Sequence, residues 1–167
     1  DGPLWVSNQT YTLPLTKAWV KACQEAGLPY NHDFNSGNLA GAGLYQLTTR
    51  NGRRCSAVDA YIRPNLHRKN LSVITNKQVT RIVVEKGRAV GVEYVENGRA
   101  TVLRAEREVV VCSGALGSPR LLLLSGIGPA EQLRSVGVNV LHDLPGVGEN
   151  LQDHTDCYLI YNLQSDS

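Results

Sequence analysis

The sequence contains no methionine, not even at position 1, and it has no long apolar run. The longest apolar stretch, residues 121–124, is far shorter than the roughly 20 residues that cross a bilayer. The chain begins on Asp1 and ends on a polar Gln-Ser-Asp-Ser stretch, which is typical of a segment of a longer protein. We therefore expect a segment whose natural termini lie elsewhere, and the lack of a leader peptide carries no meaning.

Paired cysteines and clustered histidines are also missing. The four cysteines, Cys23, Cys55, Cys112 and Cys157, show no CxxC spacing, so the sequence argues against a zinc or redox motif and predicts free thiols, buried or half-buried. The four histidines share no ligand spacing, so no metal site is expected. A net charge of +2 gives no electrostatic basis for binding nucleic acid or an anionic membrane.

What the sequence does contain is enough apolar surface for a packed core, with 42% hydrophobic and 19% charged residues. Residues 15–26 repeat apolar side chains at helical spacing, and Gly27 follows as a C-terminal cap, which predicts a helix. A second helix is expected to begin at Ser56 and to end at Pro64. The side chains expected to form the buried face of the first helix are Leu15, Trp19, Ala22, Cys23 and Ala26.

The rest of the first half predicts loops and short strands. Residues 31–43 are rich in asparagine and glycine and have no periodicity, so they predict a loop. This loop is either a plain surface loop or part of a lid over a substrate channel, and the pattern does not separate the two. Short strands are expected at residues 3–7, 44–48 and 71–75.

The second half predicts an antiparallel β-meander followed by alternating strands and helices. Three β-rich runs, residues 79–85, 89–95 and 99–104, are separated by turn sequences that contain glycine. The fold class is therefore α/β with a prominent antiparallel meander, and not a simple doubly wound sheet. Later elements are expected as strands at residues 108–112, 138–141 and 158–161, a helix beginning at Ser118-Pro119, and a short helix at residues 130–136.

One segment offers a place for chemistry. The expected strand at residues 108–112 runs into Ser113-Gly114-Ala115 and then into a helix, so free backbone N–H groups face the turn. Such groups suit a phosphate or another electron-rich edge of a ligand. The same pattern also serves tight packing of a strand against a helix, and no GxGxxG fingerprint occurs in the chain.

Several motifs resemble those of the glucose–methanol–choline (GMC) oxidoreductase family. Residues 114–128, GALGSPRLLLLSGIG, resemble the second signature of that family at every defined position. Residues 145–154, PGVGENLQDH, resemble the segment with which the family continues. The similarity covers almost the whole chain and is greatest for the choline-dehydrogenase-like branch. Further segments that resemble the family in order and spacing are residues 1–4, 53–56, 70–73 and 88–94.

The resemblance implies a domain organisation. The chain would form the central part of a Rossmann-like, FAD-binding domain, including the antiparallel meander, together with part of a substrate-side sheet. Residues 1–55 would belong to the substrate-binding domain and residues 56–154 to the middle of the FAD-binding domain. Residues 155–167 would return to the substrate-binding domain.

The resemblance also implies FAD as cofactor and the oxidation of a small-molecule primary or secondary alcohol, with hydride passing to flavin N5. The family's dinucleotide fingerprint, its acidic ribose ligand and its catalytic histidine find no counterpart in this sequence. We therefore assign no catalytic residue and expect the chain to be inactive on its own. The alcohol, the choice between oxidase and dehydrogenase, the compartment and the oligomeric state do not follow from the sequence.

Four residues are expected to contact the cofactor. Val79 resembles the family residue whose backbone N–H and C=O meet the edge of the adenine, a contact that tolerates other side chains. Ser113, Gly114 and Ala115 resemble the turn that passes beside the ADP moiety, where small residues allow close approach.

Two charged or polar pairs are interpreted as structural. Asp153-His154 is expected to be a hydrogen-bonding pair near the edge of the flavin domain, with a direct role in the site as the less favoured interpretation. Arg53-Arg54 is expected to be a solvated or packing element in preference to a phosphate clamp.

Two other functions stay open from the sequence. A flavin-containing lyase on the same scaffold would carry similar motifs without net redox change. A stand-alone, non-catalytic module would expose apolar surface and would self-associate to cover it.

Overall fold

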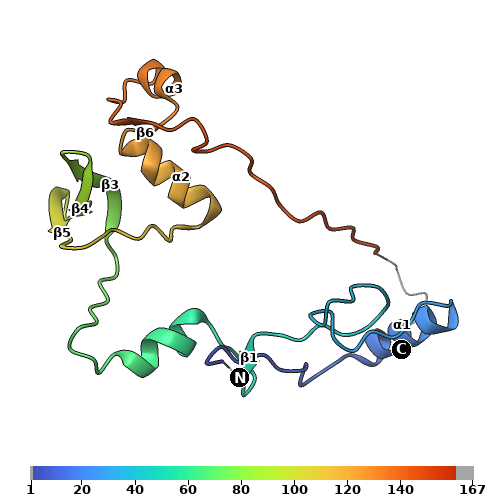
Figure 1. Ribbon diagram of the computed structural model, residues 1–167. Coiled ribbons are helices and arrows are strands. Elements are labelled where there is room, and N and C mark those ends of the chain that lie inside the picture. The colour runs from blue at the N-terminus through green and yellow to red at the C-terminus, as the bar shows by residue number, and fades with distance from the viewer. Residues whose placement is uncertain (1, 161–167) are drawn as a thin grey trace. The chain divides into compact units, whose positions relative to one another are not determined.

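The computed structural model describes residues 2–160, and the chain divides into two compact units, Asp1–Val73 and Ile74–Ser167 (Figure 1). Each unit is described by itself. The described helices are all too short or too polar to cross a membrane. The expected domain boundaries after residues 55 and 154 stay predictions.

The first unit contains the expected helix, α1 (Pro14–Glu25), which has proline in its first turn. It ends on Gly27, whose φ of 93° lets the chain turn back on itself. The N–H of Gly27 donates to the Gln24 carbonyl at 3.0 Å, and the N–H of Leu28 donates to the Cys23 carbonyl at 3.0 Å. The glycine cap therefore satisfies the final carbonyls of the helix, as the sequence predicts.

The prediction of which residues form the buried face of α1 is wrong. Leu15 and Trp19 are each 53% exposed, and Val20 is the buried residue of the helix. Helical periodicity identifies an apolar face but does not specify what covers it, and the described residues of this unit leave most of that face open.

The strands of the first unit are shorter than expected. β1 (Thr49–Arg50) and β2 (Arg53–Arg54) have two residues each and pair as an antiparallel hairpin. Asn51 and Gly52 supply the two positive φ angles, 52° and 73°, of a type I′ turn. The strands expected at residues 3–7 and 44–48 reduce to a single bridge between Ser7 and Leu47, and residues 71–75 form no strand.

The loop at residues 31–43 is organised around one buried asparagine. Asn31 is 6% exposed, and its side-chain N–H groups donate to the carbonyls of Asn38 and Ala40 at 2.7 and 3.2 Å. Its backbone N–H donates to the Ala42 carbonyl at 2.9 Å, which closes the base of the loop. A Cβ on Gly43 would overlap the Asn31 carbonyl. The loop is therefore held in one conformation by its own bonds.

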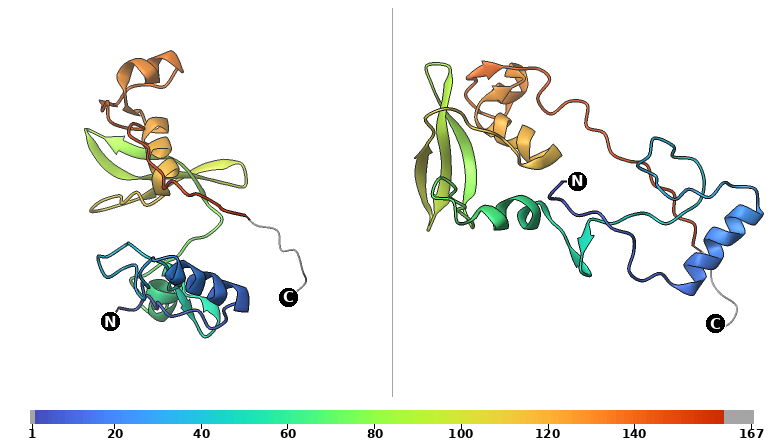
Figure 2. Two further views of the ribbon diagram at one scale, coloured as in Figure 1. Left: turned by 90° about the vertical axis from the view of Figure 1, so that its right-hand side faces the viewer. Right: turned by 60° about the horizontal axis from the view of Figure 1, so that its bottom comes forward.

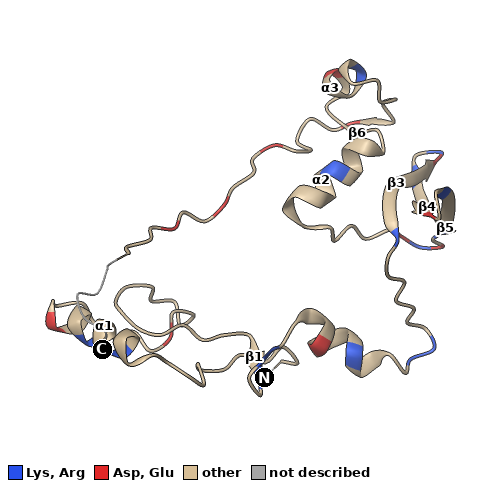
Figure 3. Ribbon diagram, turned by 180° about the vertical axis from the view of Figure 1, so that it is seen from behind, with Lys and Arg blue, Asp and Glu red and all other residues tan. Residues whose placement is uncertain are grey.

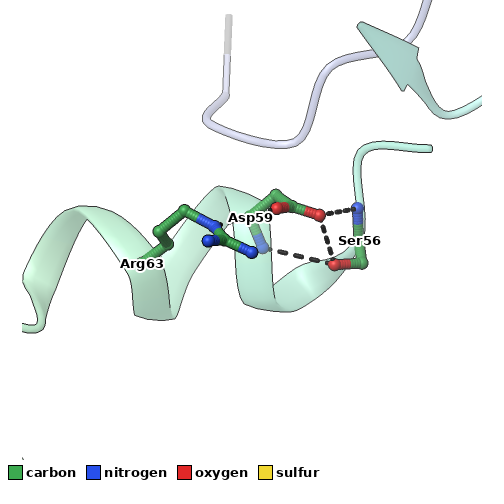
Figure 4. A network of polar contacts seen from close by, with 3 residues as sticks. All are labelled: Ser56, Asp59 and Arg63. Atoms are coloured by element: carbon green, nitrogen blue, oxygen red, sulfur yellow. Dashed lines mark hydrogen bonds and ion pairs between the residues drawn. The ribbon is translucent and has the colours of Figure 1, made fainter. Parts of the chain in front are cut away.

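The helical segment after Ser56 begins with a reciprocal cap (Figure 4). The Asp59 N–H donates to Ser56 Oγ at 3.3 Å, while the Ser56 N–H and hydroxyl donate to the Asp59 carboxylate at 3.1 and 2.6 Å. Arg63 Nε lies 3.1 Å from the same carboxylate. The bonds from Ser56, followed by Arg63, hold the pKa of the Asp59 carboxyl below its ordinary value.

This segment differs from an ordinary α-helix. It consists of a π-helical turn, η1 (Val58–Ile62), followed by a 3₁₀ turn, η2 (Arg63–Asn65). The expected end at Pro64 is wrong by one residue, because a proline fits within the first residues of a 3₁₀ turn.

The second unit contains the expected meander, drawn in green and yellow in Figure 2. Its strands pair antiparallel in the order β3-β4-β5. The turns between them are Lys86-Gly87, at φ 51° and 76°, and Asn97-Gly98, at φ 51° and 75°, both of type I′. The strands are β3 (Gln78–Glu85), β4 (Arg88–Glu96) and β5 (Arg99–Arg104).

Helix α2 (Gly114–Leu124) packs against β3. The helix begins four residues before the expected start at Ser118, so that Pro119 lies inside it. The Ser118 hydroxyl is free to accept the Ser113 N–H at 3.1 Å, which draws the chain into the helical turn early. Residues 108–112 form no strand, because none of the described strands pairs with them.

A small parallel βαβ element completes the described part of this unit. β6 (Ile127–Gly128) pairs with β7 (His142–Asp143), and α3 (Ala130–Ser135) connects them. Leu133 of α3 is 2% exposed and is the most buried side chain described. The Asp143 carboxylate accepts the Ala130 N–H at 3.0 Å and so satisfies the start of α3.

Two expectations for the end of the chain differ from the structure. The strand expected at residues 138–141 lies at β7 instead. Residues 158–160 form no strand, and residue 161 lies outside the described residues.

Gly126 and Gly137 provide a matched test of packing at helix ends. They have the same backbone conformation, with φ 78° and 77°. A Cβ on Gly126 would overlap the Asn139 carbonyl oxygen, whereas the space beside Gly137 is open. Gly137→Ala is expected to lower the free energy of unfolding by about 1 kcal/mol, the cost of left-handed backbone. Gly126→Ala is expected to cost about 3 kcal/mol or more, because the backbone clash adds to that cost.

Urea titrations of the full-length protein, followed by circular dichroism, measure both losses. Equal losses for the two variants would contradict this account, since they would mean that the chain at Asn139 moves aside without cost.

Candidate cofactor site

A cleft of about 480 Å³ lies between the first residues of β3 and one face of α2, from Ser113 at its start to Leu124 at its end. Two of the four residues expected to contact a cofactor, Val79 and Ser113, line this one cleft although they lie far apart in the sequence. The packing of α2 against β3 brings them together. The full lining consists of Lys77, Gln78, Val79, Thr80, Ser113, Gly117, Arg120, Leu121 and Leu124.

The β3 wall of the cleft contains an irregularity next to Val79. Val79 pairs with Tyr94 and Arg81 pairs with Glu93, so Thr80 is an extra residue in the strand. Arg81 and Thr80 donate to the Glu93 carboxylate at 2.7 and 2.9 Å. These bonds, that from Arg81 first, hold the pKa of the Glu93 carboxyl below its ordinary value. The bonds to Glu93 of β4 therefore stabilise β3 at its irregular position.

The Val79 carbonyl is already engaged in part. The side-chain N–H of Gln78 donates to it at 3.3 Å. Lys77, at the same end of β3, pairs with Glu96 and lies 5.7 Å from the centre of the Tyr94 ring.

The first turn of α2 has unused backbone donors, which follow directly after Ser113 in the chain. The N–H groups of Gly114, Ala115 and Leu116 find no acceptor among residues 2–160. The Ser113 side chain does not cap them. Gly114 has a φ of 82°, a conformation that places a glycine at the first position of the helix at little cost. The positive end of the helix dipole and these free N–H groups suit an anion or another electron-rich edge.

The two walls are joined at their far end by Ser125. Its hydroxyl donates to the Leu121 carbonyl at 2.6 Å and accepts the N–H of Ile82 in β3 at 2.8 Å. Ser125 is 5% exposed and Ile82 is equally buried. The helix end is therefore bonded directly to the outer edge of the strand.

Ala115 and Gly114 do not line the cleft that contains Val79 and Ser113. Ala115 lines a second, more apolar groove of about 960 Å³, formed by α2 with residues 146–152. Gly114 lines neither groove. Arg120, the only charged residue of α2 (Figure 3), lines both. The expectation that Ser113, Gly114 and Ala115 act as one contact surface stays a prediction.

The charges of the cleft favour a negatively charged ligand. Arg120 is exposed and forms no ion pair or hydrogen bond within residues 2–160. Leu121 and Leu124 add an apolar wall, and Gly117 places no side chain in the cleft. A planar base against the leucines and phosphates near the helix N-terminus would match this lining. The residues present therefore fit the nucleotide part of FAD.

The pairs interpreted as structural are outside this cleft. Arg53 and Arg54 form β2, and both are exposed. The His154 backbone N–H, and not its imidazole, donates to the Asp153 carboxylate at 2.8 Å. Asp153 and His154 are therefore hydrogen-bonded to each other, but through the His154 backbone, and this bond does not involve the imidazole.

The four cysteines form no disulfide within the described residues, and Cys55 is buried and Cys23 half-buried, as predicted. The predicted burial is wrong for Cys112 and Cys157, which are both exposed. The described residues contain no cluster of three metal-ligating side chains. Cys55 accepts the Trp5 backbone N–H at 3.4 Å, which gives this thiol a structural role in the first unit.

The first unit has a cleft of its own, of about 890 Å³, whose lining includes His32, Asp33 and Gln46. The Gln46 side-chain N–H donates to the His32 carbonyl at 2.8 Å, and its oxygen has no hydrogen-bond partner in the described part of the chain. That oxygen is out of reach of solvent, so a molecule in the cleft does not contact it.

Sequence reasoning missed Arg120 and Ser125. Both lie inside the signature-like run of residues 114–128, whose glycine turn at the start is the part that predicts a ligand contact. A serine immediately before a glycine that ends a helix is a usable signal, because its hydroxyl can bond back to the helix and also reach a neighbouring element.

A family profile described as GMC oxidoreductase matches residues 1–156. Among curated proteins, the oxygen-dependent choline dehydrogenase of Rhizobium johnstonii is 46% identical over 158 residues, which are 95% of this chain and 29% of that protein. The human mitochondrial choline dehydrogenase is 45% identical over 159 residues, 95% of this chain and 27% of that protein. The chain thus spans less than a third of the length of these relatives.

Solved structures agree with the sequence relatives. Pyridoxine 4-oxidase from Mesorbium loti matches with a TM-score of 0.83 and 38% identity, over 92% of this chain and 30% of that one. An FAD-dependent oxidoreductase from Chaetomium thermophilum matches with a TM-score of 0.84 and 32% identity, over 92% and 27%. The fold class expected from the sequence is confirmed. With the family profile spanning nearly all of its residues, the chain belongs to the GMC oxidoreductase family.

Proposed function

We propose that this chain supplies the adenine-side contacts and part of the scaffold of an FAD-dependent oxidoreductase that acts on the CH–OH group of a small alcohol. One observation carries the proposal. Val79 of β3 and Ser113 at the start of α2 line the same cleft, next to free helix N–H groups and an unpaired arginine. Choline dehydrogenases among the relatives support the alcohol as the substrate class.

In this proposal the residues of the chain bind and orient the cofactor. The Val79 backbone meets the adenine edge, at the end of β3 that lines the cleft. The helix N-terminus at Ser113, Gly114 and Ala115 faces the ADP moiety, and Arg120 adds a positive charge. FAD, when bound, supplies the two-electron acceptor that takes hydride at N5.

Handling of the substrate proton is assigned to no residue of this chain. Its four histidines, His32, His67, His142 and His154, do not line the Val79–Ser113 cleft. We therefore expect the isolated chain to be inactive, with hydride transfer depending on residues that it does not carry.

A flavin-containing lyase on the same scaffold is the competing function, and anaerobic mixing of the full-length protein with substrate separates the two. With choline or a simple primary alcohol as donor, the oxidised flavin absorbance is expected to bleach, because hydride reduces the ring. Cleavage of a hydroxynitrile to a carbonyl compound and cyanide, with a flavin that stays oxidised throughout, would favour the lyase. A full-length protein that is colourless and stays inert after addition of FAD would contradict both.

The cofactor assignment is tested by a charge at Ser113. Ser113→Asp and Ser113→Asn differ by one charge, and both residues are good caps for a helix N-terminus, so neither is expected to unfold α2. In the full-length protein we expect Ser113→Asn to bind FAD within about threefold of the unaltered protein. Ser113→Asp is expected to weaken binding about tenfold or more, because its carboxylate repels the anionic cofactor at short range.

Isothermal titration of the apoprotein with FAD measures these affinities, and thermal unfolding without FAD checks the fold. Equal affinities for the two variants would contradict the placement of the ADP moiety beside Ser113.

Self-association of the isolated chain is a separate proposal, supported by its exposed apolar side chains. Leu116, at the start of α2, is 72% exposed and lines the larger apolar groove. We expect the 167-residue chain to form oligomers in light scattering at micromolar concentration, and Leu116→Ser to reduce their fraction. Unaltered chain that stays monomeric throughout would contradict the proposal.

A further inference from the structure

Ser125 is the one buried polar side chain among residues 74–160, and the proposed cofactor contacts do not use it. It is 5% exposed and lies directly after α2. Its hydroxyl is fully engaged, donating to the Leu121 carbonyl at 2.6 Å and accepting the Ile82 N–H at 2.8 Å. It does not line the Val79–Ser113 cleft, so it does not contact a ligand there.

The position of this bond allows it to affect the distance between the two walls of the cleft. Ile82 lies three residues after Val79 on β3, and Ser125 lies at the opposite end of α2 from Ser113. An 11-residue helix is about 16 Å long, so a tilt of about 5° at the Ser125 end displaces the Ser113 end by about 1.4 Å. A displacement of that size is enough to lose hydrogen bonds to a ligand held between the two walls.

Neighbouring residues make the Ser125 bond hard to replace. β3 is an edge strand of its sheet, so no other strand in residues 74–160 accepts the Ile82 N–H. Gly126 follows with a φ of 78°, and its carbonyl accepts the N–H groups of Leu141 and His142 at 2.8 and 3.1 Å. The chain is therefore fixed on both sides of Ser125, and its hydroxyl is the link between the helix and the strand.

We propose that Ser125 is a positioning residue for FAD: it sets the distance between the β3 edge that presents Val79 and the α2 N-terminus that presents Ser113. This inference rests on the proposed function, since it concerns the same cleft. Loss of the hydroxyl leaves the buried Ile82 N–H without a partner, whereas the Leu121 carbonyl keeps its bond from the Ser125 backbone N–H, and α2 then shifts toward whatever position relieves the Ile82 N–H.

The test uses the full-length apoprotein and isothermal titration with ADP and with FAD, at a temperature where every variant is folded. Ser125→Ala is expected to weaken ADP binding about tenfold. Ser125→Thr keeps the hydroxyl and is expected to bind within about threefold of the unaltered protein.

Ser135→Ala is the matched control. The Ser135 hydroxyl also donates to a carbonyl of its own helix, Gln132 at 2.8 Å, but it is exposed and joins no second element. Its loss is expected to leave ADP affinity unchanged.

Affinity at a temperature where the protein is folded distinguishes positioning from general stability. A purely structural role would lower the unfolding temperature of Ser125→Ala while leaving its ADP affinity within twofold of the unaltered protein, and that result would overturn the inference. If Ser125→Ala does not fold, Ser125→Cys replaces it, since a thiol is a weak acceptor. Unchanged ADP affinity in that variant would overturn the inference equally.

The unaltered protein separates this inference from the proposed function. Failure of the unaltered protein to bind either FAD or ADP would overturn the proposed function and this inference with it. Binding that is normal in the unaltered protein and survives in Ser125→Ala would overturn this inference alone.

Discussion

The described part of the second unit depends on how the outer edge of β3 is covered. An edge strand exposes backbone donors and acceptors that must be satisfied by water, by another strand or by side chains. Here the cover is a helix, which offers no ladder of its own, so a side chain must supply the acceptor. Ser125 does this for Ile82, and both residues are only 5% exposed. The cleft beside Val79 lies between the same helix and strand.

Local sequence signals succeeded where the chain needed no distant partner. The turns Lys86-Gly87 and Asn97-Gly98 force a meander by their positive φ angles, and Gly27 ends α1 by the same means. The failures are strands that need a neighbour. Residues 71–75 and 108–112 have the composition of buried strands, yet none of the described strands pairs with them. Composition records the tendency to pair, but pairing itself is a property of the assembled sheet.

The candidate site was predictable in part for the same reason. Motif resemblance pointed to Val79 and Ser113 separately, and only the packing of α2 on β3 shows that they share a cleft. Ala115 was predicted with them, but a helix turns by about 100° per residue, so two positions further along the chain it lines a different groove. The position of Arg120 in the site could not be predicted, because it precedes a run of leucines and the sequence does not indicate which groove its side chain lines.

The signature-like run at residues 114–128 therefore combines two physical tasks. Its first part supplies small residues and free N–H groups where a ligand can approach α2. Its last part, Ser-Gly-Ile-Gly, meets steric and hydrogen-bonding demands far from that approach: a Cβ on Gly126 would overlap the Asn139 carbonyl, and one on Gly128 would overlap the Leu123 side chain. A motif that is typical of a cofactor-binding family therefore serves cofactor binding only in part. Its glycines hold β6 against α2, and this packing keeps the helix, and with it the ligand-facing turn, at a fixed distance from β3.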